Sequence, residues 1–144
     1  GGKTGPTSGN PLDLAVKVIA IQQGYLHRFP QAHGEPLLFP TGDVVALHCQ
    51  GIDIVVSSER SQCFSPCIFE DLDLDPQNKK LLIVKSTQHF HSAFAPMASE
   101  IVYMAAPGAI PPIMQHIPYQ RMKIEDKFPW MENPFTEEKV NYEI

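Results

Sequence analysis

The chain has 144 residues, of which 43% are hydrophobic and 19% are charged, a balance typical of one soluble domain with a single core. Its net charge is −5 and its basic residues do not cluster, which argues against nucleic acid as a partner. No apolar run approaches the roughly 20 residues that a membrane helix needs, so we expect no membrane association. The three cysteines and the lack of a secretory signal predict free thiols and a cytoplasmic location.

The first 41 residues predict a loop, a strand and an irregular excursion. Residues 1–11 form a glycine-rich loop in this interpretation. Residues 12–21 alternate apolar and polar side chains, which is the period of a half-buried strand. Residues 22–41 hold two glycines and three prolines. Because proline fixes φ and lacks a backbone donor, we expect this stretch to be irregular.

The middle of the chain predicts a hairpin followed by a short helix. Residues 44–49 and 52–57 are rich in strand-forming side chains, and only Gln50-Gly51 separates them. A two-residue connection that contains glycine is typical of a β-hairpin. Proline is favoured at the first position of a helix, so residues 66–72 predict a short helix.

The second half predicts a strand, a helix and a strand. Residues 81–84 and 101–104 are short apolar runs, and residues 87–95 between them are helical in character, with Ser86 or Thr87 as the N-cap. Such a unit forms a right-handed βαβ crossover. The predicted fold class is therefore α/β in the α+β mixed sense. It has a mixed β-sheet with a β-hairpin and one βαβ crossover, and then a proline-rich irregular C-terminal tail.

The segment LLIVKSTQHFHSAF contains the strongest candidate site. It places Lys85 and Ser86 where the predicted strand ends and the predicted helix begins, a junction at which free backbone N–H groups attract anions. His89 and His91 follow, about 200° apart on a helix, so they could not share a metal from one helical face. We expect His89 to assist Lys85 and Ser86 in binding an anionic or polar group. The alternative is that His89 packs locally and His91 is exposed.

Other motifs lack the parts that a ligand site needs. Gly2 and Lys3 suggest a phosphate loop, but prolines follow where a helix would be needed, so a turn near a ligand or a plain surface turn remains. Asp71, Asp73 and Asp75 lack the glycine and glutamate of a calcium loop and predict a solvated acidic turn. The cysteines are too sparse for a structural zinc site, and no catalytic Ser-His-Asp or Cys-His set can be assigned. We therefore assign no metal ligand and no catalytic residue to this chain.

A resemblance to a known family rests on several stretches in order: GGKTGPTSGNP, VVSSERSQCFSP, DLDP and LLIVKSTQHFHSAFAPMASEIVYMAAPGA. They resemble the C-terminal region of the microcystinase C-like (MlrC-type) metallopeptidases over about residues 1–122. The most specific part is KS-x-x-HF with the following AFAP. Residues 123–144 match only loosely and would form an irregular C-terminal tail.

The resemblance implies that the chain is the C-terminal domain of a longer zinc-dependent hydrolase of peptide or amide bonds. The zinc ligands of that family lie in a larger N-terminal α/β domain, so this chain alone would bind no zinc and would be inactive. Lys85, Ser86, His89 and Phe90 carry over directly, whereas many relatives have arginine at the position of His91. A role that needs a permanent cation is therefore less suited to His91.

Two hypotheses follow from the residues and the resemblance together. In the first, the chain packs against the N-terminal catalytic domain of the same protein and lines a cleft for a peptide or small amide substrate. In the second, it is a non-catalytic structural or dimerisation module that covers the catalytic domain, with a homo-oligomer as an open alternative. The candidate substrate-binding residues of the first hypothesis are Lys85, Ser86, His89, His91, Gly2 and Lys3.

Overall fold

The computed structural model describes residues 10–106, 113, 115, 117, 119–124 and 127. The chain divides into two units: residues 13–102 form one, and residues 1–12 with 103–144 form the other. All five strands of the described residues lie in the first unit. None of the helices within the described ranges is long and apolar enough to cross a membrane.

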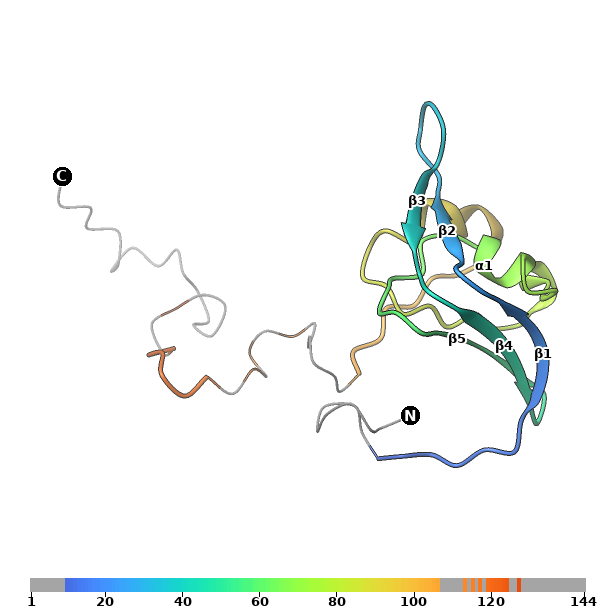
Figure 1. Cartoon of the computed structure of the whole chain (residues 1–144). Coiled ribbons are helices and arrows are strands. Elements are labelled where there is room, and N and C mark those ends of the chain that lie inside the picture. The colour runs from blue at the N-terminus through green and yellow to red at the C-terminus, as the bar shows by residue number, and fades with distance from the viewer. Residues whose placement is uncertain are drawn as a thin grey trace. The chain divides into compact units, whose positions relative to one another are not determined.

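The strands form two antiparallel sheets (Figure 1). In the larger sheet β4 (Val44–Cys49) lies between β1 (Lys17–Gln22) and β5 (Ile52–Ser57). The smaller sheet pairs β2 (Leu26–Phe29) with β3 (Leu37–Pro40). The strand predicted at residues 12–21 therefore exists, but it begins and ends later in the chain. The prediction of a mixed sheet gives way to antiparallel pairing throughout the described residues.

The two sheets are joined as one long, bent hairpin. The Tyr25 amide donates to the Gly42 carbonyl at 2.7 Å, and the Thr41 amide donates to the Tyr25 carbonyl at 3.0 Å, so the ladder continues from β1–β4 into β2–β3. The β2–β3 arm extends beyond the larger sheet in Figure 1. The prediction that residues 22–41 are irregular is therefore wrong. The prolines of this stretch lie in the loop and at a strand end, where a missing backbone donor is tolerated.

The predicted hairpin at residues 44–57 is confirmed with its predicted bounds. Cys49 faces Ile52 across the turn. Gln50 and Gly51 both have positive φ, at 50° and 82°. Positive φ at both central residues is the requirement of a type I′ turn, whose twist matches that of the two strands. The Gln50-Gly51 turn therefore fits the register of this hairpin.

The core lies where the segment around α1 (Cys67–Glu70) covers one face of β4. Helix α1 has four residues, shorter than the helix predicted for residues 66–72. Val44 and Ala46 alternate as buried residues along β4, with 1% and 0% exposure. The buried side chains of the core cluster are Tyr25, Val44, Ala46, Ile68, Leu72 and Leu74.

The βαβ crossover expected from residues 81–104 is wrong for the described residues. Residues 81–84 and 101–104 are not strands, and the only α-helix between them is α2 (His91–Phe94), which leads into the 3₁₀ turn η3 (Ala95–Met97). Leu81, Ile83 and Val102 are 75%, 74% and 76% exposed. An apolar run becomes a buried strand only when a neighbouring strand supplies its hydrogen-bond ladder, and no ladder to either run forms among the described residues.

The contrast between Leu72 and Leu81 gives a test of this core. Leu72 is fully buried, so Leu72→Ala should destabilise the chain by about 2–5 kcal/mol, because it removes buried methyl groups and leaves a cavity. Leu81→Ala is the matched control and should change the free energy of unfolding by about 0.5 kcal/mol or less. Urea unfolding of the 144-residue chain measures both. Equal losses at the two positions would contradict the placement of the core.

Candidate functional site

Two of the predicted site residues meet at one glutamine. The Ser86 hydroxyl donates to Gln62 Oε1 at 3.0 Å, and His89 Nδ1 lies 3.3 Å from the same oxygen. Gln62 is in the segment between β5 and α1, more than 20 residues earlier in the chain. These three residues, called the Gln62 site below, form a small polar group on the surface, in which Gln62 and His89 are exposed and Ser86 is half-buried.

The ring of His89 rests on aromatic side chains. Its centroid lies 5.9 Å from that of Phe29 on β2, in an edge-to-face arrangement, and 6.0 Å from that of Phe64. Phe64 is itself 8% exposed and packs against Phe29 and Phe39 at 5.1 Å and 4.7 Å. Aromatic contacts of this geometry restrict the ring without covering its polar nitrogens. The position of His89 is therefore determined by packing as well as by Gln62.

The other predicted residues are not gathered into the Gln62 site by any described contact. Lys85 and His91 are both exposed. The helix expected to begin after Ser86 begins at His91, lasts one turn and has no side-chain cap, so it supplies no helix N-terminus to Lys85 and Ser86. Gly2 and Lys3 lie outside the described residues. The roles of these residues remain predictions.

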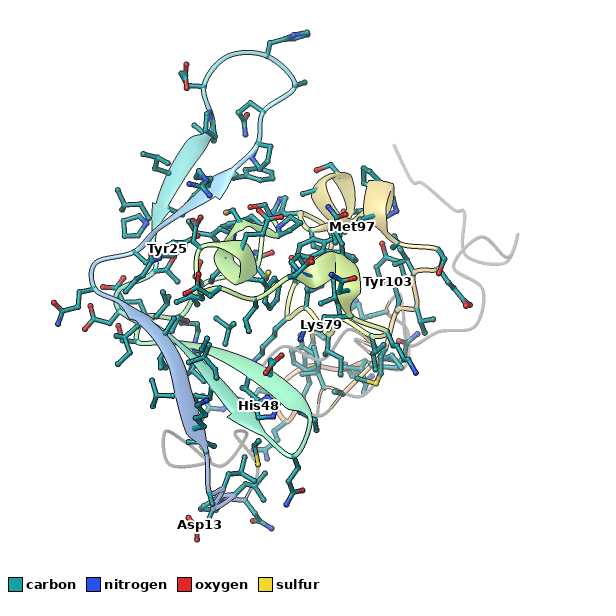
Figure 2. All side chains as sticks on the ribbon, turned by 90° about the vertical axis from the view of Figure 1, so that its right-hand side faces the viewer. Asp13, Tyr25, His48, Lys79, Met97 and Tyr103 are labelled. Atoms are coloured by element: carbon teal, nitrogen blue, oxygen red, sulfur yellow. The ribbon has the colours of Figure 1, made fainter. Side chains whose placement is uncertain are left out.

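A second cluster, which the sequence did not predict, surrounds the sulfur of Cys67 at the start of α1. Cys67 Sγ lies 2.9 Å from Ser65 Oγ and 3.5 Å from the Tyr25 hydroxyl. His27 Nε2 lies 3.3 Å from the same Ser65 oxygen. All four residues, called the Cys67 cluster below, are buried, with 0–8% exposure. Figure 2 shows Tyr25 where the β2–β3 arm leaves the larger sheet.

The protons of the Cys67 cluster have competing acceptors. The Ser65 hydroxyl has one proton to donate. Its oxygen lies 2.7 Å from the Arg28 carbonyl oxygen and 2.9 Å from the sulfur, so these two acceptors compete for that proton. A protonated thiol can donate to Ser65 Oγ, whereas a thiolate can only accept from it. His27 Nε2 lies 3.2 Å from the Ser65 carbonyl and 3.3 Å from the Ser65 amide, and His27 Nδ1 has no hydrogen-bond partner among the described residues. One buried ring nitrogen thus stays unsatisfied in either tautomer.

The surroundings lower the pKa of Cys67 and raise the pKa values of Cys63 and Tyr25. Burial alone raises the pKa of Cys67, but hydrogen bonds from His27, Ser65 and Tyr25 outweigh it and lower that pKa from 9.0 to about 6. Burial, with the nearby charge of Cys67, raises the pKa of Cys63 to about 12. Burial, followed by the hydrogen bond to Cys67, raises the pKa of Tyr25. Cys67 is therefore the group that ionises first, and Cys63 remains a thiol.

Ion pairs attach the Cys67 cluster to its surroundings. Arg28 Nη2 contacts both carboxylate oxygens of Asp71, at 3.0 and 2.8 Å, and the Tyr25 hydroxyl donates to Asp71 at 2.9 Å. Asp71 caps the C-terminal end of α1, and its carbonyl accepts from the Gln22 side chain. The prediction of a solvated acidic turn is thus wrong for Asp71, because its carboxylate is bound by Arg28 on β2 and by Tyr25, the residue before β2.

The described residues do not fit a zinc centre. No group of three or more histidine, cysteine, aspartate or glutamate side chains is placed to hold a metal ion in the described part of the chain. His48 Nδ1 lies 2.6 Å from Asp53 Oδ1 across β4 and β5, and Lys79 pairs with the same carboxylate, so His48 Nδ1 and both carboxylate oxygens already have partners. The Cys67 cluster does not fit a structural zinc either, because that metal needs four ligands and the cluster offers only the thiol and one imidazole as usual zinc ligands.

Sequence reasoning missed the Cys67 cluster because no local pattern encodes it. Cys67 lies 42 positions from Tyr25, and Ser65 lies 38 from His27. Residues that far apart share no local motif that could have been recognised. The one available signal was the polar His27 within a stretch that becomes a strand, where a fully buried imidazole requires partners.

Ionisation of Cys67 predicts how stability depends on pH. A lowered folded pKa means that the thiolate stabilises the fold fully above the unfolded value near 9, and that this contribution is lost as the pH falls through about 6. The folding constant of the wild type relative to Cys67→Ser should therefore rise with pH between 6 and 9, by at most about tenfold per pH unit. Urea titrations at several pH values measure this, with Cys49→Ser as the control. A difference that stays constant over this range would contradict the assignment.

Comparisons with known proteins cover most of the chain. Residues 1–121 match the family model described as MlrC C-terminus. The chain is also similar to Microcystinase C from Sphingomonas sp., with 33% identity over 106 residues. That alignment covers 74% of this chain and 20% of the relative, so the chain matches about a fifth of the relative's length.

Proposed function

Because the chain belongs to the family of MlrC C-terminal domains, as the resemblance predicted, we propose that it is the C-terminal domain of a hydrolase of peptide or small amide bonds. In this proposal the domain lines one side of a substrate cleft, and the remainder of the longer polypeptide forms the other side. The observation that carries the proposal is the convergence of Ser86 and His89 on Gln62 at the surface, above an aromatic support of Phe29 and Phe64.

Each residue of this surface has a distinct task in the proposal. Lys85 supplies a positive charge to a substrate carboxylate, or to the oxygen that becomes negative when an amide is attacked. Ser86 and His89 offer polar groups to the same substrate, and Gln62 sets their orientation. The exposure of Lys85 and His89 supports this reading over a buried folding signature, since a buried lysine would have to be paired. His91, Gly2 and Lys3 are secondary candidates for the rim of the cleft.

The apolar surface supports packing against a larger partner. Leu81 and Ile83 are about three-quarters exposed, and Val102 is exposed to the same extent. Exposed apolar patches of this kind mark interaction sites in proteins that are stable in water. The alignment leaves about four-fifths of the relative's length without a counterpart in this chain. In the proposal, these apolar runs pack against the N-terminal catalytic domain of the same polypeptide.

The metal and the cellular location follow from the same proposal. Zinc, the metal implied by the resemblance, is assigned to the N-terminal domain, because the described residues of this chain do not fit a zinc centre. The zinc there would supply a Lewis acid and an activated water. The three cysteines are unpaired, which supports a reducing compartment such as the cytoplasm.

A second candidate function is a non-catalytic dimerisation module. The same exposed apolar runs favour it, because a second copy of the chain could cover them as well as a different domain could. Sedimentation of the complete protein separates the two candidates when it is combined with Leu81→Glu. A change from dimer to monomer with unchanged catalytic activity would support the module, and a monomeric wild type would exclude it.

Lys85 tests the substrate-binding role directly. In the complete protein, Lys85→Ala should lower kcat/KM for its peptide substrate by about 10- to 100-fold, as expected for losing a charge-assisted hydrogen bond. Lys80→Ala is the matched control, because Lys80 is also an exposed lysine of the same segment, and its kcat/KM should stay within about twofold of the wild type. An unchanged kcat/KM for Lys85→Ala would remove Lys85 from the site.

Zinc content tests the division of labour between the two parts. The complete protein should contain stoichiometric zinc and hydrolyse peptides, whereas the 144-residue chain should contain none and should be inactive. Atomic absorption and a peptidase assay, run in parallel on both proteins, measure this. Tight zinc binding by the 144 residues alone would overturn the assignment of the metal to the N-terminal domain.

A further inference from the structure

An open cleft reaches the Cys67 cluster from the surface. Its volume is about 390 Å³. Cys67 and Ser65 lie at this cleft, and its other lining residues include Arg28, Pro30, Pro36 and Glu70. The proline walls are stiff, because proline has a fixed φ. Cys67 and Ser65 thus lie on the wall of a cleft that is open to small molecules.

Two hydroxyls lie close enough to the sulfur to donate to a thiolate. Ser65 Oγ is 2.9 Å and the Tyr25 hydroxyl 3.5 Å from it, and each would donate to a thiolate in competition with a second acceptor, the Arg28 carbonyl for Ser65 and the Asp71 carboxylate for Tyr25. His27 Nε2 lies against the same serine oxygen. The Arg28 guanidinium stays nearby as a fixed positive charge, paired with Asp71. Cys63, whose pKa is raised to about 12, remains a neutral thiol, so the charged groups beside the cluster are the paired Arg28 and Asp71. Reactive cysteines are found in such partly accessible surroundings with several hydrogen-bond donors.

We propose that Cys67 is a nucleophilic thiolate and an oxidation site whose reactant is a small hydroperoxide such as hydrogen peroxide. The thiolate attacks one peroxide oxygen, so that an S–O bond forms and the O–O bond breaks. Sulfur is oxidised by two electrons to a sulfenic acid, and the departing hydroxide takes a proton from solvent to become water. This site is separate from the Gln62 site and does not depend on the proposed hydrolase function.

Small size and lack of charge select the peroxide as the reactant. Cys67 is only 8% exposed, so small uncharged reactants such as hydrogen peroxide, or iodoacetamide as a probe, reach it more readily through the cleft than large or charged ones do. The hydroxyls of Tyr25 and Ser65 can donate to the attacked peroxide once the sulfur has approached it. Cys63 cannot compete, since its thiol stays protonated at neutral pH.

The pH dependence of alkylation is the first arm of the test. The full chain is treated with iodoacetamide at a series of pH values, native and in urea, and labelling of each cysteine is measured by peptide mass spectrometry. Native Cys67 should reach half its maximal rate near pH 6, and in urea near pH 9. At pH 6 the native rate should lie within about twofold of its plateau, whereas the rate in urea should lie more than a hundredfold below. Coincident native and denatured profiles would overturn the proposal.

Matched variants separate the hydrogen bonds from general burial. Ser65→Ala and Tyr25→Phe each remove a hydroxyl that contacts the sulfur, so the half-maximal pH should rise in both. Ser61→Ala is the control, because its hydroxyl bonds to the Gln62 carbonyl and not to the cluster. Protection of Cys63 from iodoacetamide in the same samples reports that the fold is intact. A profile that no variant moves would contradict the role of the hydroxyls.

The second arm uses hydrogen peroxide itself. The full chain is exposed to peroxide at pH 6.5 and then to dimedone, which traps sulfenic acids. Cys67 should be trapped before Cys49, and Cys63 should stay unmodified. Cys67→Ser should abolish the early adduct, and Cys49→Ser should leave it unchanged. Trapping of Cys49 at the same rate as Cys67, or alkylation of Cys67 without any sulfenic acid, would overturn the assignment of a hydroperoxide.

Discussion

A single carboxylate at the end of α1 joins that helix to the long bent hairpin. Asp71 accepts hydrogen bonds from Tyr25 and Arg28, and its carbonyl accepts one from Gln22, so it connects the helix to the long bent hairpin. The larger sheet has only three strands and α1 has only four residues. Helices this short are not stable without tertiary contacts. The Asp71 contacts therefore position Cys67, and with it the whole Cys67 cluster.

Local chemistry could be predicted from the sequence, and long-range pairing could not. The hairpin of residues 44–57 was predicted with its bounds because Gln50-Gly51 specifies the turn. Residues 81–84 were predicted as a strand from their apolar character, but apolar character does not distinguish a buried strand from an exposed apolar segment. Ser86 and His89 were identified as neighbours, yet their partner Gln62 carries no signal of its own. Cys67 escaped prediction because its partners come from a strand about 40 positions away.

Phe64 connects the two clusters of this domain. Its ring lies 5.5 Å from that of His27 on one side and 6.0 Å from that of His89 on the other. A buried aromatic ring in a close-packed interior transmits displacement to its neighbours, since little empty volume can absorb it. The Gln62 site and the Cys67 cluster therefore share one wall, although each is built from its own polar groups.

The separation in sequence between the partners of Cys67 has a consequence for the order of folding. The β4–β5 hairpin closes over two residues and can form within microseconds, whereas the contacts of Ser65 and Cys67 with Arg28 and Tyr25 join residues 37 and 42 positions apart. The sulfur gains the Tyr25 hydroxyl only when α1 docks on the β2–β3 arm. Loss of the thiol proton in refolding experiments near neutral pH would accordingly mark this late docking step, and the ultraviolet absorbance of the thiolate would time it without an added label.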